Sequence, residues 1–328
     1  MQRKNKEKIV FFYEGPSFGH AVWAKAIGAK FIPDLDPGPK MGSGMLKRIW
    51  NGFRRLFILS KIPKDTDILL VEGGLGFIVG WLFKKFRKKK VIMIVADPLF
   101  KALKENKFAA SIILPMLKKF DGFLPVADMM YDLIPFKQKR NIRTFYENQF
   151  KKIKPNCKKN NLISVGIIDE RKGTWEMIKI FNKIKKKIKD AKFYLVGRGP
   201  LKENVENKKI PGMVLTGYDK PEKYFPKCPI YLAFSKFDPF PASVLEAMAS
   251  GLVPIITPEV GSTELIKDID PGLIIKNEKQ AANKIIQLLK NKKKLKQLSN
   301  KIKKKASKFT KENSIKMFKK SFYELASS

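Results

Sequence analysis

The sequence predicts two α/β domains in series, each built on a doubly wound parallel sheet. First, a chain of 328 residues exceeds the roughly 250–300 residues at which single cores stop growing. Second, short apolar runs alternate with longer segments of helical periodicity along most of the chain. Third, a basic, Asn-containing stretch at 150–161 interrupts this alternation and is typical of a linker. We therefore expect domains at 1–155 and 156–310, followed by a terminal helical segment at 311–328.

The expected strands are short apolar runs that read as buried parallel strands. In the first half they are 9–14, 30–33, 68–73, 91–97 and 123–127. In the second half they are 162–168, 192–197, 213–217, 230–235, 252–257 and 273–276. Residues 278–328 are Lys-rich and show helical periodicity without a strand pattern.

The composition restricts the class of protein. Hydrophobic residues make up 44% and charged residues 30% of the chain, which supplies two packed cores and excludes a disordered protein. Two cysteines, Cys157 and Cys228, provide no disulfide framework, as expected for a reducing cytosol. A single histidine, His20, excludes Cys2His2 zinc. The apolar run after the basic start is too short for a signal peptide, and the longest run, Gly73–Phe83, is too short for a membrane span. We expect a cytoplasmic protein, soluble or peripheral on the cytoplasmic membrane face.

The net charge of +38 is the feature that most resembles a nucleic-acid-binding protein. The excess is +15 in residues 1–150 and +23 in residues 151–328, so it is not confined to one domain. Only nine of the 68 cations are arginines, although Arg leads phosphate and base recognition. We therefore expect solvated lysine faces and no nucleic-acid partner, with attraction to an anionic membrane as a milder consequence.

The most informative segment is Ser235–Thr257, SKFDPFPASVLEAMASGLVPIIT. A strand is followed by a Pro-bearing loop with Asp238, and by a short helix with Ser243 as its expected cap and Glu246 in its first turn. The free N–H groups at a helix start are suited to phosphate oxygens. Carboxylates nearby can accept hydrogen bonds from sugar and ribose hydroxyls. The segment thus predicts a pocket for a nucleotide sugar.

This segment resembles the Glu–seven residues–Glu motif of the retaining GT-B glycosyltransferases, the family 4-like or group 1 glycosyl transferases. The match is closest over VLEAMASGLVPII. The resemblance implies that Glu246 binds the nucleotide ribose and that Asp238, with Phe240 beside it, binds the donor sugar. It also implies that Pro241, Ala242, Ser243 and Val244 form the helix start that meets the diphosphate. The chain departs from the motif at the first acid, which is Asp238, and at Pro239 and Pro241, where the family has glycine.

Three further stretches resemble the same family. VGIIDERKGTWEMIKIF (165–181) is similar to the segment whose Arg and Lys grip the donor diphosphate. The resemblance assigns that role to Lys172, which with Asp238 is a catalytic candidate, whereas Ile167 stands at the Arg position and Arg171 is a candidate substitute. YLVGRGP (194–200) implies that Gly197, Arg198 and Gly199 line the nucleotide pocket. VGSTELIKD (260–268) places Glu264 at a motif acid.

In the first half the candidates are contacts to the acceptor or, for the first loop, to donor phosphate. EGPSFGHA (14–21) follows the first expected strand, and such Gly loops let backbone approach a ligand. By the same resemblance Gly15, Ser17 and Gly19 are candidates, and His20 is either an acceptor contact or a locally bonded helix-start residue. Glu72 and Asp97 end strands at the carboxyl edge, where α/β ligands bind, or are turn and cap residues.

An alternative for PDLDPGP (33–39) is the metal-binding DxD of the other glycosyltransferase fold, with Asp34 and Asp36 as ligands. The flanking Pro and Gly favour a surface turn, and Asp268 and Asp270 repeat the spacing. We therefore expect neither a metal nor another cofactor, and treat the nucleotide sugar as a substrate.

The resemblance implies the GT-B fold: two Rossmann-like domains facing each other across a cleft, with the C-terminal helix crossing back to the first domain. It implies a retaining hexosyltransferase that uses a nucleotide-diphosphate sugar and a glycan or lipid-linked acceptor. The alternatives are a non-catalytic nucleotide or polyanion binder and a nucleotide-sugar epimerase.

A membrane-facing helix is predicted at 43–58, SGMLKRIWNGFRRLFI. Seven apolar side chains fall within an arc of about 140°, and cations fill the other side, as in interfacial helices. A second basic-aromatic stretch follows at Phe77–Lys90. The alternative is that the apolar arc covers the sheet of the first domain.

Overall fold

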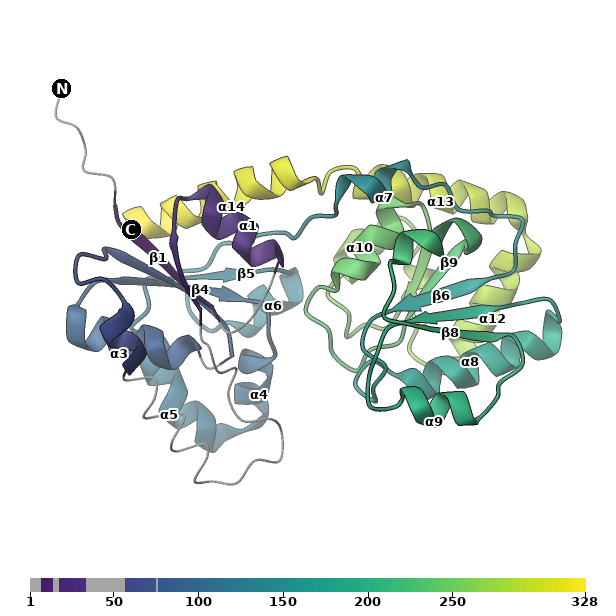
Figure 1. The fold of residues 1–328 in the computed structure, drawn as a ribbon, viewed down its shortest axis with the longest axis horizontal. Helices are drawn as coiled ribbons and strands as arrows, with labels where there is room; N and C mark the ends of the chain where they lie inside the picture. Colours follow the sequence, from purple (N-terminus) through teal and green to yellow (C-terminus); the bar gives the residue numbers. More distant parts are fainter. Residues whose placement is uncertain (1–6, 14–17, 34–56, 75) are drawn as a thin grey trace. The chain divides into compact units, whose positions relative to one another are not determined.

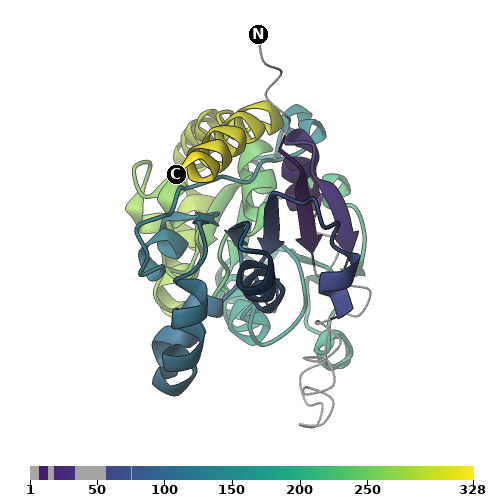
Figure 2. The same ribbon diagram turned by 90° about the vertical axis from the view of Figure 1, so that its left-hand side faces the viewer.

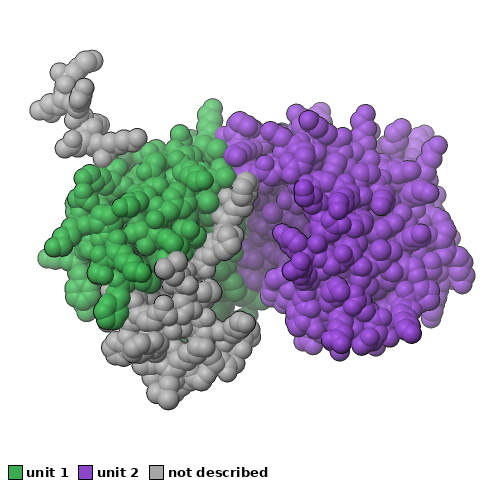
Figure 3. Space-filling model, viewed as in Figure 1, with its two compact units in different colours: residues 1–143, 314–328 green, residues 144–313 purple. Residues whose placement is uncertain are grey.

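The computed structural model describes residues 7–13, 18–33, 57–74 and 76–328 (Figure 1). The chain divides into two compact units, residues 1–143 with 314–328 (unit 1) and residues 144–313 (unit 2), which Figure 3 colours separately. The first division falls after Arg143, earlier than the linker expected near residue 155. Both units are α/β structures with parallel sheets, as the sequence predicts.

Unit 1 contains a five-stranded sheet in the order β2-β1-β3-β4-β5. The strands are β1 (Ile9–Tyr13), β2 (Lys30–Pro33), β3 (Ile68–Glu72), β4 (Lys90–Val95) and β5 (Gly122–Pro125). All neighbouring pairs are parallel. The strand order reverses direction between β1 and β3, so the carboxyl ends of these two strands form the switch point at which such sheets bind ligands.

The helices of unit 1 flank this sheet. They are α1 (Phe18–Ala26), α3 (Gly76–Arg87), α4 (Leu99–Glu105), α5 (Lys107–Leu117), α6 (Asp128–Leu133) and α14 (Lys311–Ser327). Helix α3 buries Phe77, Val79, Leu82 and Phe83. The apolar side of the 77–90 stretch therefore belongs largely to the core, because it packs on β3 and β4, and the interpretation of that stretch as a membrane surface is wrong for these residues.

The last helix, α14, is part of unit 1 although it follows unit 2 in the sequence (Figures 1 and 2). Trp23 of α1 donates from Nε1 to Ser314 Oγ at 2.8 Å and stacks on Phe318 with ring centroids 5.5 Å apart. At the sheet, a Cβ on Gly122 would lie 2.6 Å from Leu325 Cδ1. The absence of a side chain at Gly122 thus lets α14 approach β5.

Unit 2 contains a second five-stranded parallel sheet in the order β10-β9-β6-β7-β8. The strands are β6 (Leu162–Val165), β7 (Phe193–Val196), β8 (Met213–Gly217), β9 (Ile230–Ala233) and β10 (Val253–Ile256). Here the switch point lies between β6 and β9, which pair in parallel. The expected strand at 273–276 is wrong, because Ile274 makes one isolated bridge to Ile256 and residues 271–273 form a 3-10 turn.

The helices of unit 2 cover both faces of its sheet (Figure 1). They are α7 (Asn148–Lys152), α8 (Thr174–Lys187), α9 (Lys202–Asn207), α10 (Ala242–Ala249), α11 (Thr263–Ile266), α12 (Glu278–Lys290) and α13 (Lys292–Ala306). Asn277 and Asn291 fix the starts of α12 and α13, since their side chains accept hydrogen bonds from Gln280 N and Lys294 N. Among the helices that the structure describes, none is long and apolar enough to cross a bilayer.

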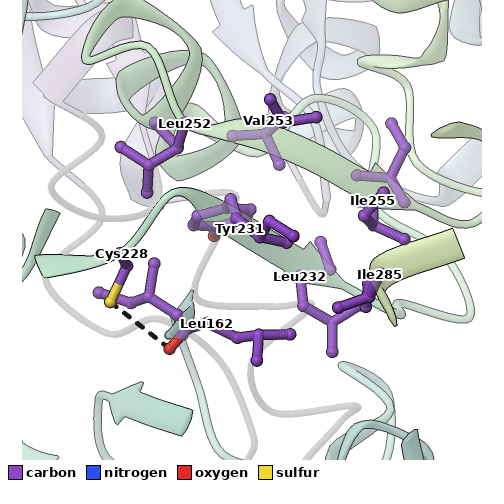
Figure 4. Close-up of a cluster of buried hydrophobic side chains, with 14 of the residues drawn as sticks. Leu162, Cys228, Tyr231, Leu232, Leu252, Val253, Ile255 and Ile285 are labelled. Carbon is purple, nitrogen blue, oxygen red and sulfur yellow. Dashed lines mark hydrogen bonds between the residues drawn. The ribbon is translucent and has the colours of Figure 1, made fainter. Parts of the chain in front are cut away.

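Side chains of neighbouring strands fill the core of unit 2 (Figure 4). Leu162 of β6, Leu232 of β9 and Ile255 of β10 are fully buried. Cys228 lies among them, with its Sγ donating to Leu162 O at 3.6 Å. Burial raises the pKa of this thiol far above its usual range, so Cys228 is a core group rather than a reactive one.

Candidate functional site

The site of unit 2 is built at the carboxyl ends of β6 and β9, where the strand order reverses. The loop after β6 runs to Lys172 and the start of α8, and the loop after β9 carries Asp238 to the start of α10. Such positions are where open α/β sheets bind ligands.

Close backbone packing fixes the loop after β6 against the loop after β7. Ideal Cβ atoms on Gly197 and Gly199 would lie 1.8 Å from Gly166 O and 2.2 Å from Ile168 O. The amide of Ile168 donates to Arg198 O at 2.8 Å. These glycines are therefore required for the approach of two loops, and Gly197 also lines the larger cavity described below.

Lys172 and Asp238 are brought together. The loop turns at Gly173, whose φ is 69° and whose Cβ would clash with Phe234 O. The Lys172 amide donates to Asp169 Oδ1 at 2.8 Å, and Lys172 Nζ donates to Asp238 Oδ2. Asp238 is buried and held on both sides, with its N–H bonded to Glu259 O and its carbonyl to Gly261 N.

Helix α10 starts at Ala242, two residues earlier than Ser243 would allow as its cap. Pro241 is the N-cap, without a side-chain cap bond, so the cap assigned to Ser243 is wrong. Ser243 Oγ instead lies 2.8 Å from the Tyr231 hydroxyl, and both hydroxyls donate to Val165 O. No carboxylate lies in the first turn of α10, so the positive end of the helix dipole is not offset there.

Two cavities meet at residues 165–167. The smaller cavity is lined by Ser164, Val165, Gly166, Ile167, Lys172, Met177, Leu195, Tyr231, Ala233, Ser235, Asp238, Pro241 and Ser243. The larger one, of about 860 Å³, is lined by Glu147, Gln149, Phe150, Val165, Gly166, Ile167, Val196, Gly197, Arg198, Tyr218, Asp219, Lys220, Pro221, Glu222 and Glu246. The larger cavity has the size of a small-molecule site, and the smaller one leads to the Lys172–Asp238 pair.

Four carboxylates, those of Glu147, Asp219, Glu222 and Glu246, line the larger cavity. Burial, followed by the charges of Glu222 and Glu147, raises the pKa of Glu246 to about 7. Glu246 lies in the second turn of α10 rather than the first. The sequence predicted Glu246 alone. Glu147, at the start of α7, and Glu222, in a 3-10 turn after β8, carry no local motif and reach the cavity only through the fold.

Other predicted donor residues lie close to the cavities with different roles. Arg171 lines neither cavity, and its Nη1 donates to Phe237 O at 3.3 Å. Ile167, which stands at the Arg position of the family pattern, is 52% exposed and lines both cavities. The Arg198 guanidinium lies over the Tyr218 ring, 5.2 Å from its centroid.

The remaining predicted residues of the motif differ in their burial and in their place in the helices. Val244 is fully buried, and Phe240 packs against the core. Ala242 is an exposed residue of the first turn of α10. Glu264 lies in the first turn of α11.

Unit 1 has a second polar cluster at its own switch point. His20 Nδ1 lies 2.6 Å from Glu72 Oε1, and the His20 ring stacks on Trp23. Glu72 Oε2 is buried with no hydrogen-bond partner among the described residues. Asp97 Oδ1 accepts from Leu99 N at 2.9 Å and Asp97 Oδ2 from Gly74 N. Burial raises the pKa of Asp97 to about 6, with a further contribution from the charge of Glu72.

The structure thus brings His20, Glu72 and Asp97 together, and Gly19 lies beside His20 in α1. Gly15, Ser17 and the Asp34–Asp36 pair lie outside the described residues, as does nearly all of the predicted helix at 43–58. The second pair of this spacing is bound to lysines, Asp268 to Lys305 and Asp270 to Lys284. Within the described ranges, no group of three His, Cys, Asp or Glu side chains is placed to hold a metal ion.

Known glycosyltransferases resemble this chain in sequence and in fold. A family model described as glycosyl transferases group 1 matches residues 145–305. A Campylobacter jejuni enzyme named N-acetylgalactosamine-N,N'-diacetylbacillosaminyl-diphospho-undecaprenol 4-alpha-N-acetylgalactosaminyltransferase is 29% identical over 163 residues, which cover 46% of this chain and 43% of that protein. The chain thus spans less than half the length of this relative.

Solved glycosyltransferase structures share the fold. Sucrose-phosphate synthase from Thermosynechococcus elongatus matches with a TM-score of 0.77 at 14% identity, over 98% of this chain and all of that one. Anabaena HepE in complex with UDP and glucose gives 0.75 at 11% identity, with the same coverage. TarM gives 0.68 at 18% identity and covers 85% of this chain and 58% of its own. Residues 145–305 therefore match the group 1 glycosyl transferases, and the chain has the two-domain GT-B fold.

Proposed function

We propose that this chain is a retaining glycosyltransferase that moves a hexose from a nucleotide-diphosphate sugar to a hydroxyl of a glycan or lipid-linked acceptor. The observation that carries the proposal is the arrangement of Lys172, the start of α10 and Glu246 around two cavities that share residues 165–167. The match of residues 145–305 to the group 1 glycosyl transferases supports the same reaction class.

The donor would occupy both cavities. Glu246 accepts hydrogen bonds from the ribose hydroxyls in the larger cavity, where Gly197 and Arg198 line the nucleotide. Lys172 and the N-terminal amides of α10 meet the diphosphate. Asp238, which Lys172 holds in place, accepts from the sugar hydroxyls. Because Lys172 and the helix start supply the positive potential, we expect transfer without an added metal ion.

In the reaction, the bond between the anomeric carbon and the phosphate oxygen breaks while the acceptor oxygen attacks the same face of the sugar. The acceptor proton passes to the leaving diphosphate. Negative charge develops on that diphosphate in the transition state, and Lys172 with the dipole of α10 stabilises it. No nucleophilic side chain of the protein is required by this route.

For the acceptor we assign the polar cluster of unit 1. His20 and Glu72 form a hydrogen-bonded pair, and the unpartnered Glu72 Oε2 is suited to accept a hydroxyl hydrogen. The relative from Campylobacter jejuni carries a diphospho-undecaprenol acceptor in its name. We therefore propose a lipid-linked acceptor, and a cytoplasmic protein that is peripheral on the membrane face.

The experiment incubates the full chain with radiolabelled UDP-, GDP- and ADP-sugars, with and without EDTA, and with glycan and polyprenyl-diphosphate acceptors. Transfer to an acceptor with the anomeric configuration of the donor, measured by NMR of the product, is the expected result. Tight nucleotide binding without transfer or hydrolysis would favour the non-catalytic binder, and a changed sugar on the nucleotide would favour the epimerase.

A further inference from the structure

Helix α5 of unit 1 differs from the other long helices that the structure describes, because most of its apolar side chains are not buried. In Lys107–Leu117, KFAASIILPML, only Leu117 is buried. Phe108 is 77% and Ile112 54% exposed. By contrast, α8 and α12 each bury five or more residues.

The exposed side chains form one stripe. At 100° per residue, Ile112 lies 40° and Pro115 about 20° from the direction of Phe108, and all three are exposed. Met116 flanks the stripe about 80° from Phe108, whereas Ile113 and Leu114 lie about 140° and 120° away on the opposite side of the helix, and all three are half-buried. We call Phe108, Ile112 and Pro115 the α5 stripe. Exposed apolar side chains contiguous along a helix mark an interaction surface.

Lysines surround the α5 stripe at both ends. Lys101, Lys104 and Lys107 precede it, and Lys118 and Lys119 follow it. Glu105 is the single acid between residues 98 and 120, and it lies 3.8 Å from Lys101 in an i,i+4 pair. The stripe and its borders therefore combine apolar exposure with a local charge of +4, from five lysines and one glutamate.

This combination identifies the occupant. Phe and Ile side chains on one face, bordered by cations at both ends, are the features of a helix that lies in a membrane interface. A protein partner for such a surface would need carboxylates on both sides of an apolar centre, whereas an anionic bilayer presents headgroups around its acyl region everywhere. The geometry points to the α5 stripe as the element that inserts into an anionic lipid surface, with Lys107, Lys118 and Lys119 at the headgroups.

This assignment differs from the one made on the sequence, which placed membrane contact at 43–58 and 77–90. It rests on the proposed function only for the lipid-linked acceptor that makes membrane attachment useful. Helix α5 follows α4 directly and is anchored to the core of unit 1 through the buried Leu117 and Phe120.

The test is co-sedimentation of the full chain with vesicles of phosphatidylcholine alone and of phosphatidylcholine with phosphatidylglycerol. The test variants are Phe108→Ser with Ile112→Ser, and Lys118→Glu with Lys119→Glu. Matched controls on the exposed side of α14 are Met317→Ser with Tyr323→Ser, and Lys316→Glu with Lys319→Glu. The thermal unfolding midpoint and nucleotide binding are measured for every variant.

We expect the wild type and both controls to bind the anionic vesicles, and each α5 variant to bind them at least about tenfold more weakly, with unchanged unfolding midpoints. Equal binding by wild type and α5 variants, or no binding by the wild type, overturns the inference. A lowered midpoint for Phe108→Ser with Ile112→Ser also overturns it, because the stripe would then be covered by another part of the chain. Nucleotide binding and transfer to a detergent-solubilised acceptor do not depend on vesicles, so their failure would count against the proposed function alone.

Discussion

Lys172 is the residue on which the proposed chemistry depends most. Its Nζ donates to the buried Asp238 carboxylate, and a charge-assisted hydrogen bond to phosphate contributes about 1.5–3 kcal/mol. Lys172→Ala should therefore lower kcat/KM by roughly 10–150-fold, toward the upper end because Ile167 supplies no second cation. Steady-state kinetics with the matched variant Lys236→Ala, an exposed lysine of the next loop, provides the control.

The same substitution leaves Asp238 without its cation. Adding Asp238→Asn to Lys172→Ala should recover part of the lost unfolding free energy without restoring activity, because the buried charge is removed but the phosphate contact is not. If Lys172→Ala transfers sugar at the wild-type rate, Lys172 does not meet the diphosphate.

Substitutions of the two motif carboxylates, Glu246 and Asp238, should affect nucleotide binding and sugar transfer separately. Glu246 lines the larger cavity and Asp238 the smaller one. Glu246→Gln should weaken nucleoside diphosphate binding, while Asp238→Asn should leave this binding within about threefold and reduce transfer by tenfold or more. Calorimetric titration and transfer rates measure the two effects. Equal losses of nucleotide affinity in both variants would contradict the division.

Glu246 also predicts a pH dependence. Its pKa of about 7 is raised by burial and by Glu222 and Glu147, and the ionised form is the better acceptor for two ribose hydroxyls. Affinity for a nucleoside diphosphate should therefore rise as pH increases through 7, by about tenfold between pH 6 and pH 8. In Glu246→Gln, which has no ionisable group at this position, the remaining pH dependence of the affinity comes from the titration of the ligand's phosphate. In Glu147→Gln the midpoint should fall, because one repelling charge is gone. If Glu147→Gln leaves the pH midpoint of nucleotide binding unchanged, a group other than Glu246 is responsible for the pH dependence.

At the scale of elements, most of the fold was predictable because its periodicity is local. Every predicted strand except 273–276 is present, since apolar runs bounded by Gly, Pro or polar residues favour a buried strand. The run at 273–276 has the same appearance but lies beside β10 for one bridge only. Whether a run pairs along its length depends on tertiary placement, which its own residues do not encode.

The site was predictable to the extent that it follows a contiguous motif. Lys172, Asp238 and Glu246 were selected because the family pattern places them, and each lines one of the two cavities. Glu147, Glu222 and the Tyr231–Ser243 pair were not found, because their partners are distant in sequence. The outward apolar face of α5 was missed for a related reason: an apolar helix predicts burial, and only the structure reveals the side that has no neighbour.

The packing of α14 on unit 1 gives a prediction for this element. Phe318 is fully buried and stacks on Trp23 and Phe322. Phe318→Ala should lower the free energy of unfolding by about 3–5 kcal/mol, whereas Lys316→Ala, on the exposed side of the same helix, should change it by less than about 0.5 kcal/mol. Urea unfolding followed by circular dichroism measures both. A small loss for Phe318→Ala would mean that unit 1 folds without its C-terminal helix.

At the scale of the whole molecule, the net charge of +38 favours non-specific association with any polyanion, and this must be distinguished from specific binding. The lysines are distributed over both halves of the chain and outnumber the arginines 59 to nine. Long-range attraction of this kind is screened within about 10 Å at 0.1 M salt and carries no base recognition. Charge alone therefore does not distinguish a membrane protein from a nucleic-acid-binding protein here, but its response to salt does.

We expect the chain to bind duplex DNA weakly, without sequence preference, and to lose about 10³-fold or more of that affinity between 50 and 200 mM salt, as for binding that rests on phosphate contacts alone. Binding to anionic vesicles should fall less steeply, because the α5 stripe adds an apolar contribution that salt does not screen. Fluorescence anisotropy with two unrelated duplexes and vesicle sedimentation over the same salt series measure the two slopes. In Phe108→Ser with Ile112→Ser the vesicle slope should become as steep as the DNA slope, since the remaining attraction is electrostatic in both cases. DNA affinity that persists at 200 mM salt, or that differs between the duplexes, would instead assign the surface charge to nucleic-acid recognition.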